Sequence, residues 1–368
     1  MSDTSKTSLK ENGMEPPHTS APHTSAHGQD AQGQDAQSPM TLSAGQVGAP
    51  RKIRLMPVGT RAEGQAPASI GNVAVGFDLL GHTLEGPADR AWVTVTETPG
   101  VTLREISGVV QQLPMEPENN TAGRALQALL AYTDGARGLA LSLEKGIALG
   151  SGMGGSAASA VAALVAAQEL LEEPLSLEQL YDCAMEGEAV ASGSKHGDNV
   201  APMLLGGLVI APAHGVPVSL PVPEWLHVAL VHPHFELETR RARAVLSGGY
   251  ALHSLVEQTE GLALVLVGLF RGDRVLMGRG LRDTLVEPRR AALIPGFAAV
   301  KAGALSAGAL GASISGAGPS VFAWFDTREG AIEGAARMAA AFASEGLSSD
   351  RYVAPVAGPA ARGWRCGT

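Results

Sequence analysis

The sequence predicts an α+β protein with two domains, and three observations support this prediction. The chain has 368 residues, of which 45% are hydrophobic and 4% are aromatic, so it can bury one large core or two ordinary ones. Strand-like and helix-like segments are mixed without a regular alternation, which favours an α+β architecture over a doubly wound sheet. A proline-rich stretch near 210–222 marks a boundary, and we expect domains at 51–215 and 216–368.

The first 50 residues are expected to form a disordered, low-complexity tail. They contain few large apolar side chains, and they carry two short repeats, PHTSA within 17–26 and GQDAQ within 28–37. Such a segment cannot bury enough apolar surface to offset the entropy lost when it becomes ordered.

The first domain is predicted to contain both strands and helices. Apolar and polar residues alternate at 90–98 as they do in a half-buried strand, and 138–149 indicates a second strand. Runs of helix-forming residues indicate helices at 121–132, 154–172 and 176–192.

The second domain is predicted to continue the mixture. The segments 226–234 and 320–326 indicate strands, and 251–270 and 329–344 indicate helices. The longest apolar run, from Leu262 to Phe270, is too short to span a bilayer and is expected to form a buried helix.

Charge and cysteine content narrow the class of protein. The formal net charge of −9 argues against a nucleic-acid-binding surface, because phosphate backbones are bound mainly by clustered lysine and arginine. Cys183 and Cys366 are too few for a disulfide framework, which suits a cytoplasmic protein. No apolar segment is long enough to cross a membrane, so no membrane role is expected.

The segment from Gly150 to Ser159 joins a glycine-rich turn to a long run of helix formers. Glycines let backbone N–H groups turn toward a small anion, and a helix that begins near Gly154 adds its own unsatisfied donors. The segment lacks the lysine of a Walker-type loop and the strand–helix–strand setting of a dinucleotide fingerprint. A mononucleotide phosphate site therefore fits better than NAD, while the segment alone is equally explained by a turn before a packed helix.

A second polar motif lies at 67–78, where small and turn-forming residues surround Asn72 and Asp78. Both side chains could reach a polar substrate. Taken alone, the motif is better explained as an ordinary turn in which Asp78 caps a helix that begins at Leu79.

Two further segments have the composition of a binding site. Residues 192–202 place His196, Asp198 and Asn199 on one loop, an arrangement that is costly unless these groups bind something. Residues 311–320 form a glycine- and serine-rich loop without bulky or charged side chains, so a ligand or another loop is expected to pack on it.

Six segments resemble motifs of the GHMP small-molecule kinases and occur along the chain in the order typical of that family. The resemblance covers about residues 57–360. Those at 67–78, 150–159 and 311–320 resemble the three signature motifs of the superfamily. Those at 196–207, 239–246 and 287–297 resemble the homoserine kinases within it. The resemblance implies a ribosomal-S5-like N-terminal α/β domain, a ferredoxin-like C-terminal α/β domain, and a homodimer.

The same resemblance implies an activity and assigns residues to it. The chain would transfer the γ-phosphoryl group of ATP to the hydroxyl of L-homoserine, with Mg²⁺, in threonine biosynthesis. The ATP phosphates would be held by Gly150, Ser151, Gly152, Met153, Gly154, Gly155, Ser156, Ala157 and Ser159. Mg²⁺ would be held by Ser156 and Glu188. Homoserine would be bound by Asn72, Asp78, His196, Asp198, Arg243 and Arg290, with its carboxylate on the two arginines.

The implied catalytic residues are Asn199, Asp198 and His196. Asn199 can only orient the hydroxyl, and either of the other two could remove its proton. The chain departs from the family pattern at Ala148, which is commonly proline, and at Gly155, which is commonly serine. Two alternatives stay open here: a GHMP kinase that acts on mevalonate or a sugar, and an inactive binding protein with the same fold.

Overall fold

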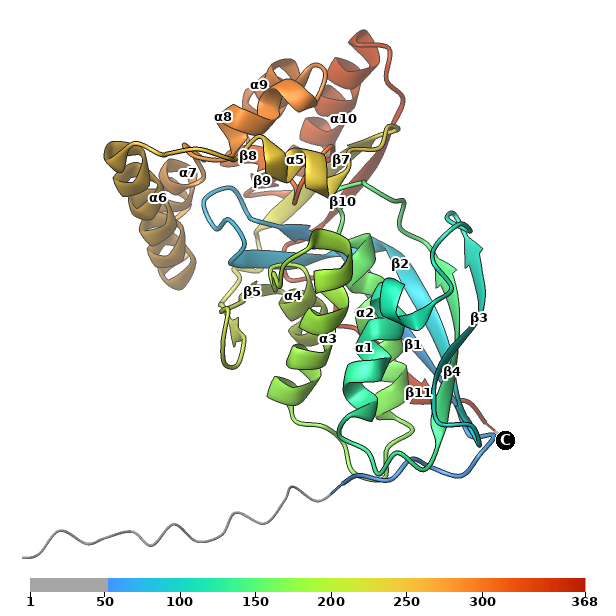
Figure 1. Cartoon of the computed structure of the whole chain (residues 1–368). Helices are drawn as coiled ribbons and strands as arrows, with labels where there is room; N and C mark the ends of the chain where they lie inside the picture. Colours follow the sequence, from blue (N-terminus) through green and yellow to red (C-terminus); the bar gives the residue numbers. More distant parts are fainter. Residues whose placement is uncertain (1–51, 368) are drawn as a thin grey trace, which may run out of the picture. The chain divides into compact units, whose positions relative to one another are not determined.

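The computed structural model describes residues 52–367 of the chain (Figure 1). The tail predicted at 1–50 lies outside these residues. The described part contains two β-sheets, and helices pack against both. This arrangement confirms the predicted α+β class.

The first sheet has the strand order β11-β1-β2-β4-β3, and the short strands β5 and β6 continue it from β2. Only β3 and β4 run parallel; the other described neighbours in this sheet are antiparallel. The strands are β1 (Arg61–Gly71), β2 (Leu80–Thr96), β3 (Gly100–Gly108), β4 (Gly138–Lys145), β5 (Leu208–Ile210), β6 (Val218–Ser219) and β11 (Arg362–Arg365). The helices beside them are η1 (Pro117–Asn119), α1 (Thr121–Leu130), α2 (Gly155–Gln168), α3 (Leu177–Ser192) and α4 (Val200–Leu205).

Glycines in two strands let α2 lie directly against this sheet. A Cβ atom added to Gly64 of β1 would lie 2.0 Å from the backbone oxygen of Ala162. A Cβ atom on Gly363 of β11 would lie 2.0 Å from that of Val165. Since close-packed interiors do not absorb such overlaps, larger side chains here would displace the helix. Because α2 begins at Gly155, the packing of this helix also fixes the position at which the glycine-rich segment ends.

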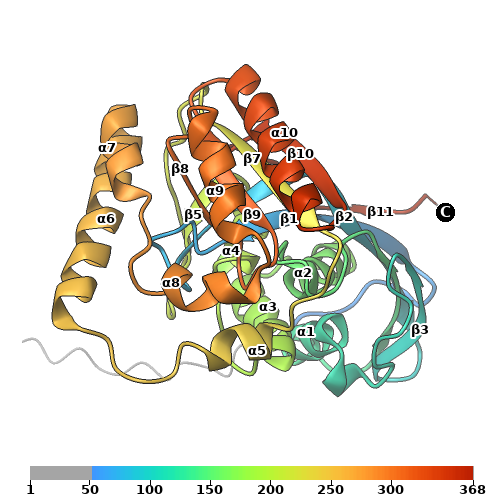
Figure 2. The same ribbon diagram turned by 90° about the horizontal axis from the view of Figure 1, so that it is seen from above.

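The second sheet is antiparallel, with the order β10-β7-β9-β8. Its strands are β7 (His227–Pro233), β8 (Gly311–Ile314), β9 (Val321–Phe325) and β10 (Ser349–Pro355). Helices α9 (Phe297–Ser306) and α10 (Arg328–Ser344) lie side by side on it, and α6 (Leu252–Arg271) and α7 (Arg274–Gly280) pack together beside it (Figure 2). The short helices are α5 (Thr239–Ala244), α8 (Glu287–Arg290) and η2 (Ala291–Leu293).

The two sheets are connected by side chains and by the chain itself. Trp324 of β9 donates a hydrogen bond from Nε1 to Nε2 of His82 in β2, at 3.2 Å, and both residues are fully buried. Strands β6 and β11 extend the first sheet, so residues on both sides of position 215 contribute to it.

Two local expectations are wrong. No helix begins at Leu79; instead β2 begins at Leu80, because Asp78 has a φ of +57° and the chain turns back to pair Gly81 with Gly71. The segment ending at Phe270 is helical, but that side chain is 69% exposed, since α6 packs against α7 along one side. None of the helices within 52–367 is long and apolar enough to cross a membrane.

Candidate active site

The segments that the sequence singled out meet around one pocket of about 330 Å³. The walls come from the turn after β1, the segment between β4 and α2, the end of α3 with the loop that follows it, and α5. Arg290 of α8 and the loop between β8 and β9 close it. The pocket therefore combines residues from both halves of the chain.

The segment from Gly150 to Ser156, which we call the phosphate loop after the ligand that the sequence predicts for it, forms part of the pocket wall. Gly150, Gly152 and Gly154 have φ values of +55°, +76° and +70°, a region that favours glycine. Helix α2 then begins at Gly155, and no side chain caps its first backbone N–H groups. Uncapped N–H groups and the positive end of the helix dipole make this wall suited to an anion.

The loop between β8 and β9 is hydrogen-bonded to the phosphate loop. Ser315 donates a hydrogen bond from Oγ to the carbonyl oxygen of Gly152, at 2.7 Å. Ser320 donates to the carbonyl oxygen of Ser151, at 2.6 Å. The expectation that another loop packs on 311–320 is confirmed by these contacts.

The nine residues predicted to hold phosphate separate into two groups. Gly150, Ser151, Gly152, Gly154, Gly155 and Ser156 line the pocket. Met153, Ala157 and Ser159 lie outside its wall and are at most 2% exposed. Ser159 is bonded to Asp89, which accepts from its hydroxyl at 2.7 Å. The glycine-rich turn faces the pocket, whereas the body of α2 faces the core.

Ser156 and Glu188 form a pair at the edge of the phosphate loop. The Ser156 hydroxyl donates to Oε2 of Glu188 at 2.8 Å, and Glu188 is only 8% exposed. Burial raises the pKa of Glu188 to about 8, and the nearby charge of Asp198 adds to this, while the Ser156 hydrogen bond opposes it. Within 52–367 no three His, Cys, Asp or Glu side chains cluster as a metal site. One hydroxyl and one carboxylate, however, fit an Mg²⁺ ion whose other ligands are phosphate and water.

Asp198 and Asn72 organise another part of the pocket wall. The backbone N–H of Asn72, whose φ is +70°, donates to Oδ2 of Asp198 at 3.1 Å. The Asn72 side chain donates to the carbonyl oxygen of Gly316 at 2.7 Å and accepts from the N–H of Asp78 at 3.0 Å. Asp198 is 4% exposed; burial raises its pKa to about 7, with a further contribution from the charge of Asp78.

Asp78 lies between an arginine and a histidine. Arg243 donates to its two carboxylate oxygens at 3.1 and 2.9 Å, which is a bidentate contact. His196 places Nδ1 at 3.1 Å from Oδ2 of the same carboxylate. Burial lowers the pKa of His196, and the charge of Asp78 opposes that effect.

Arg290 is 2% exposed and is held by backbone oxygens. Its Nε donates to Ala242 at 3.0 Å and its Nη1 to Gly316 at 2.9 Å. Burial lowers its pKa to about 10, and the charge of Arg243 lowers it further. The Cζ atoms of both arginines lie 5.4 Å from the ring centroid of Phe77, within the range of a cation–π contact.

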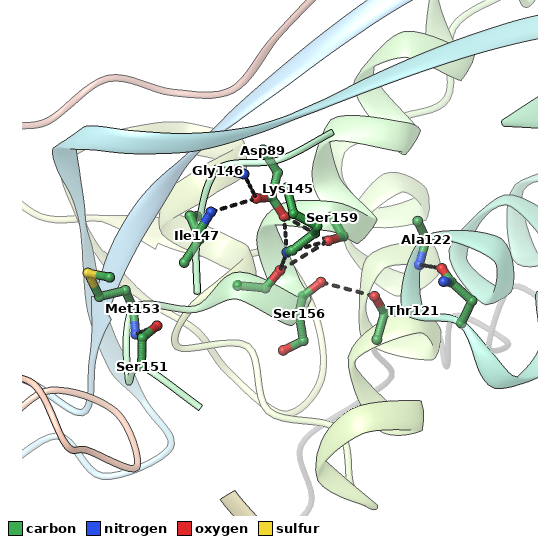
Figure 3. A network of polar contacts seen from close by, with 12 residues as sticks. Asp89, Thr121, Ala122, Lys145, Gly146, Ile147, Ser151, Met153, Ser156 and Ser159 are labelled. Atoms are coloured by element: carbon green, nitrogen blue, oxygen red, sulfur yellow. Dashed lines mark hydrogen bonds and ion pairs between the residues drawn. The ribbon is translucent and has the colours of Figure 1, made fainter. Parts of the chain in front are cut away.

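Four residues in or behind the site were not predicted from the sequence. Phe77 lies under both arginines, and Ser69 donates to Oδ1 of Asn199 at 2.8 Å. Behind the phosphate loop, Lys145 contacts Asp89 in the core (Figure 3). The one available signal was a lysine at the end of an apolar strand, directly before the glycine-rich segment.

Comparisons with known proteins identify the family to which the chain belongs. The model of the GHMP kinases N terminal domain matches residues 120–207, and that of the GHMP kinases C terminal region matches 265–344. The homoserine kinase of Xanthomonas campestris pv. campestris (strain B100) is 56% identical over 297 residues, which are 81% of this chain and 92% of that protein. The homoserine kinase of Xylella fastidiosa (strain 9a5c) is 53% identical over 307 residues, 83% of this chain and 95% of that protein.

Solved structures give the same picture. The homoserine kinase from Cytophaga hutchinsonii superposes with a TM-score of 0.79 at 38% identity, covering 84% of this chain and 99% of its own. The L. major mevalonate kinase in complex with R-mevalonate has a TM-score of 0.58 at 16% identity, with coverage of 83% and 100%. The second match shows a shared fold, and the first extends to a shared family.

Proposed function

This chain belongs to the homoserine kinases of the GHMP kinase family, and on that premise we propose that it transfers the γ-phosphoryl group of ATP to the side-chain hydroxyl of L-homoserine. The product is O-phospho-L-homoserine, an intermediate for threonine biosynthesis. One observation carries the proposal: a single pocket has uncapped helix N–H groups on one wall and a carboxylate–arginine cluster on the other. The first wall suits a polyphosphate, and the second suits an amino acid.

The ATP phosphates are proposed to bind along the phosphate loop. The backbone N–H groups of this loop and of the first turn of α2 supply fixed donors, and the helix dipole favours negative charge there. Met153, Ala157 and Ser159, which are buried, would support the loop rather than contact the nucleotide.

Ser156 and Glu188 are proposed to hold Mg²⁺. When bound, the ion neutralises negative charge on the phosphate oxygens. Their oxygens lie 2.8 Å apart, so both can face one ion without a large rearrangement. Because the raised pKa of Glu188 keeps its carboxyl group protonated at neutral pH, binding of a cation at this pair would release a proton.

Homoserine is proposed to bind against the cluster of charged side chains formed by Asp78, Asp198, Arg243 and Arg290. Its ammonium group is complementary to the carboxylates, and its carboxylate is complementary to the guanidinium groups. Arg243 has a buried Nε without a hydrogen-bond partner among the described residues, which leaves a donor for the substrate. Asn72 and His196 complete this wall through their contacts with the two carboxylates.

The hydroxyl of homoserine is proposed to be oriented by Asn199 and deprotonated by Asp198 or His196. Asn199 is anchored by Ser69 and cannot accept a proton. Phosphoryl transfer has a loose transition state, so positioning and charge neutralisation supply most of the catalysis. The base then contributes a smaller factor, and the pH dependence of turnover identifies it.

A mevalonate- or sugar-type activity and an inactive binding protein are the competing functions. Mevalonate and sugars lack the ammonium group that the paired carboxylates would recognise. An ADP-release assay with homoserine, mevalonate, galactose and no acceptor separates the possibilities. We expect release with homoserine alone; release with mevalonate but not homoserine, or no release with any acceptor despite ATP binding, would overturn the proposal.

The cellular context is proposed from the family. We propose a cytoplasmic homodimer, as the resemblance to GHMP homoserine kinases implied. Light scattering of the purified full chain measures its mass directly, and a monomer mass across the working concentration range would contradict the dimer.

A further inference from the structure

A lysine and an aspartate are buried together directly behind the phosphate loop (Figure 3). Lys145 is the last residue of β4 and is 2% exposed, and Asp89 in β2 is fully buried. The ammonium group contacts Oδ2 of Asp89. Taking two charges out of water carries a desolvation penalty that an apolar pair of similar size would avoid, so this arrangement calls for an explanation.

Every hydrogen-bonding group of this pair is used. Besides Asp89, the Lys145 ammonium donates to the carbonyl oxygen of Gly155 at 2.7 Å and to Oγ of Ser159 at 2.8 Å. The second carboxylate oxygen of Asp89 accepts from the N–H groups of Gly146 and Ile147, at 3.0 and 3.2 Å. A fully satisfied buried network of this kind is rigid.

The network holds both ends of the phosphate loop. Gly146 and Ile147 lead into the loop from β4, and Gly155 and Ser159 lie in the first turns of α2. The glycines between them have no side chains to fix their conformation. Hydrogen bonds from Ser315 and Ser320 restrain the middle of the loop, and the Lys145–Asp89 network adds a link between its two ends. Loss of that link would leave the loop more conformational freedom, and ordering it on binding would weaken the affinity.

The contact with Gly155 also holds the first peptide of α2. Because a trans peptide is planar, a hydrogen bond to the Gly155 carbonyl oxygen restrains the N–H of Ser156 in the same peptide unit. Ser156 is one of the residues that line the pocket. The same peptide carries the Ser156 side chain, which is bonded to Glu188.

We infer that Lys145 and Asp89 are positioning residues that preorganise the phosphate loop for a nucleotide phosphate, acting through Gly155, Ser159 and the 146–147 backbone. This inference rests on the proposed binding of ATP by this loop. Neither residue lines the pocket, so both act on the ligand indirectly.

The test is the dissociation constant of Mg–ATP, measured by titration calorimetry, together with the melting temperature of each variant. Lys145→Met removes the ammonium group while retaining much of the apolar stem, and we expect ATP binding about tenfold weaker or more. The KM for homoserine should stay within about twofold of the unsubstituted chain, because its wall is untouched. Leu129→Ala, which empties a buried position in α1, is the control for lost stability.

A double variant separates positioning from stability. Lys145→Met combined with Asp89→Asn leaves no unpaired buried charge, so its melting temperature should recover relative to Lys145→Met alone. ATP binding should stay weak, because the contact with Gly155 is still missing. If ATP affinity recovers together with the melting temperature, or if Lys145→Met binds ATP as tightly as Leu129→Ala does, the inference is wrong.

Two further readouts keep the test decisive. If Lys145→Met does not fold, Ser159→Ala retains the ion pair and removes one hydrogen-bonded link between the pair and α2. We expect a severalfold loss of ATP affinity; unchanged affinity would contradict the inference.

ATP binding does not depend on the acceptor. An unsubstituted chain that binds ATP but leaves homoserine unmodified would therefore overturn the proposed function and leave the positioning role standing.

Discussion

Arg243 holds Asp78 through two contacts, with Nη1 at 3.1 Å from Oδ2 and Nη2 at 2.9 Å from Oδ1. Asp78 follows the turn after β1, and Arg243 lies on α5, 165 residues later. The residues expected to recognise the opposite charges of homoserine therefore pair with each other. Substrate binding must be compatible with this contact, either by sharing it or by exchanging it.

Arg243→Ala is expected to raise the KM for homoserine roughly 10- to 100-fold, because a charge-assisted contact is lost. The KM for ATP should change by less than about twofold. Steady-state kinetics with each substrate varied in turn measures both values. Arg241→Ala is the control, since Arg241 lies on the same helix, is exposed and does not line the pocket. Equal effects of the two substitutions would remove Arg243 from the substrate site.

An added methyl group is expected to affect the KM for ATP strongly at Gly152 and only weakly at Gly155. A Cβ atom on Gly152, whose φ is +76°, would lie 2.5 Å from the carbonyl oxygen of Ser315, so Gly152→Ala should raise the KM for ATP at least about tenfold. At Gly155 the φ is ordinary and the nearest atom is a methyl group of Ile147 at 3.2 Å, so Gly155→Ala should stay within about threefold. A large effect at Gly155 alone would contradict this account of the loop.

The value of kcat/KM for homoserine is expected to fall as the pH drops through about 7, because Asp198 becomes protonated there and can no longer accept the hydroxyl proton. The sign follows from a raised pKa: the carboxylate form is present above this value and is lost below it. A pH profile of kcat/KM measures the limb. Asp198→Asn should lower kcat roughly 100-fold or more and abolish the limb. If the fall in activity at low pH persists in Asp198→Asn but disappears in His196→Gln, His196 is the base instead.

Glu188→Gln is expected to lower kcat and to raise the Mg²⁺ concentration needed for half-maximal activity by at least about tenfold. An amide oxygen carries no net charge, so it binds the ion less strongly than a carboxylate. Activity is measured across an Mg²⁺ titration, after removal of divalent cations with a chelator. Glu186→Gln is the matched control, because Glu186 lies on the same helix but pairs with Arg124 and Lys195. An unchanged Mg²⁺ requirement in Glu188→Gln would contradict the metal assignment.

The parts of the site that are encoded locally were predictable from the sequence. The phosphate loop and the start of α2 follow from adjacent glycines and helix formers, so the sequence of 150–159 by itself indicates a candidate anion site. The turn at 67–78 was only half predictable. Its polar residues were noticed, but β2 was not expected to begin at Leu80, because positive φ values at Asn72 and Asp78 reverse the chain.

The parts that depend on distant residues were not predictable from composition or spacing. Arg243 and Arg290 were identified only through the family resemblance, since their meeting over Phe77 requires both halves of the chain to be folded. Asp89 and Lys145 are 56 residues apart and lie on different strands, so nothing local indicates that they meet. Burial of Ser159 likewise reflects the packing of α2 on the sheet.

The central claim is that the γ-phosphoryl group of ATP reaches the side-chain hydroxyl of homoserine. Phosphorus NMR of a reaction containing the full chain, ATP, Mg²⁺ and L-homoserine tests it most directly. We expect a phosphate monoester signal coupled to the terminal methylene protons of homoserine, growing in step with ADP. Inorganic phosphate alone, or a monoester that forms only when mevalonate or a sugar replaces homoserine, would contradict the claim.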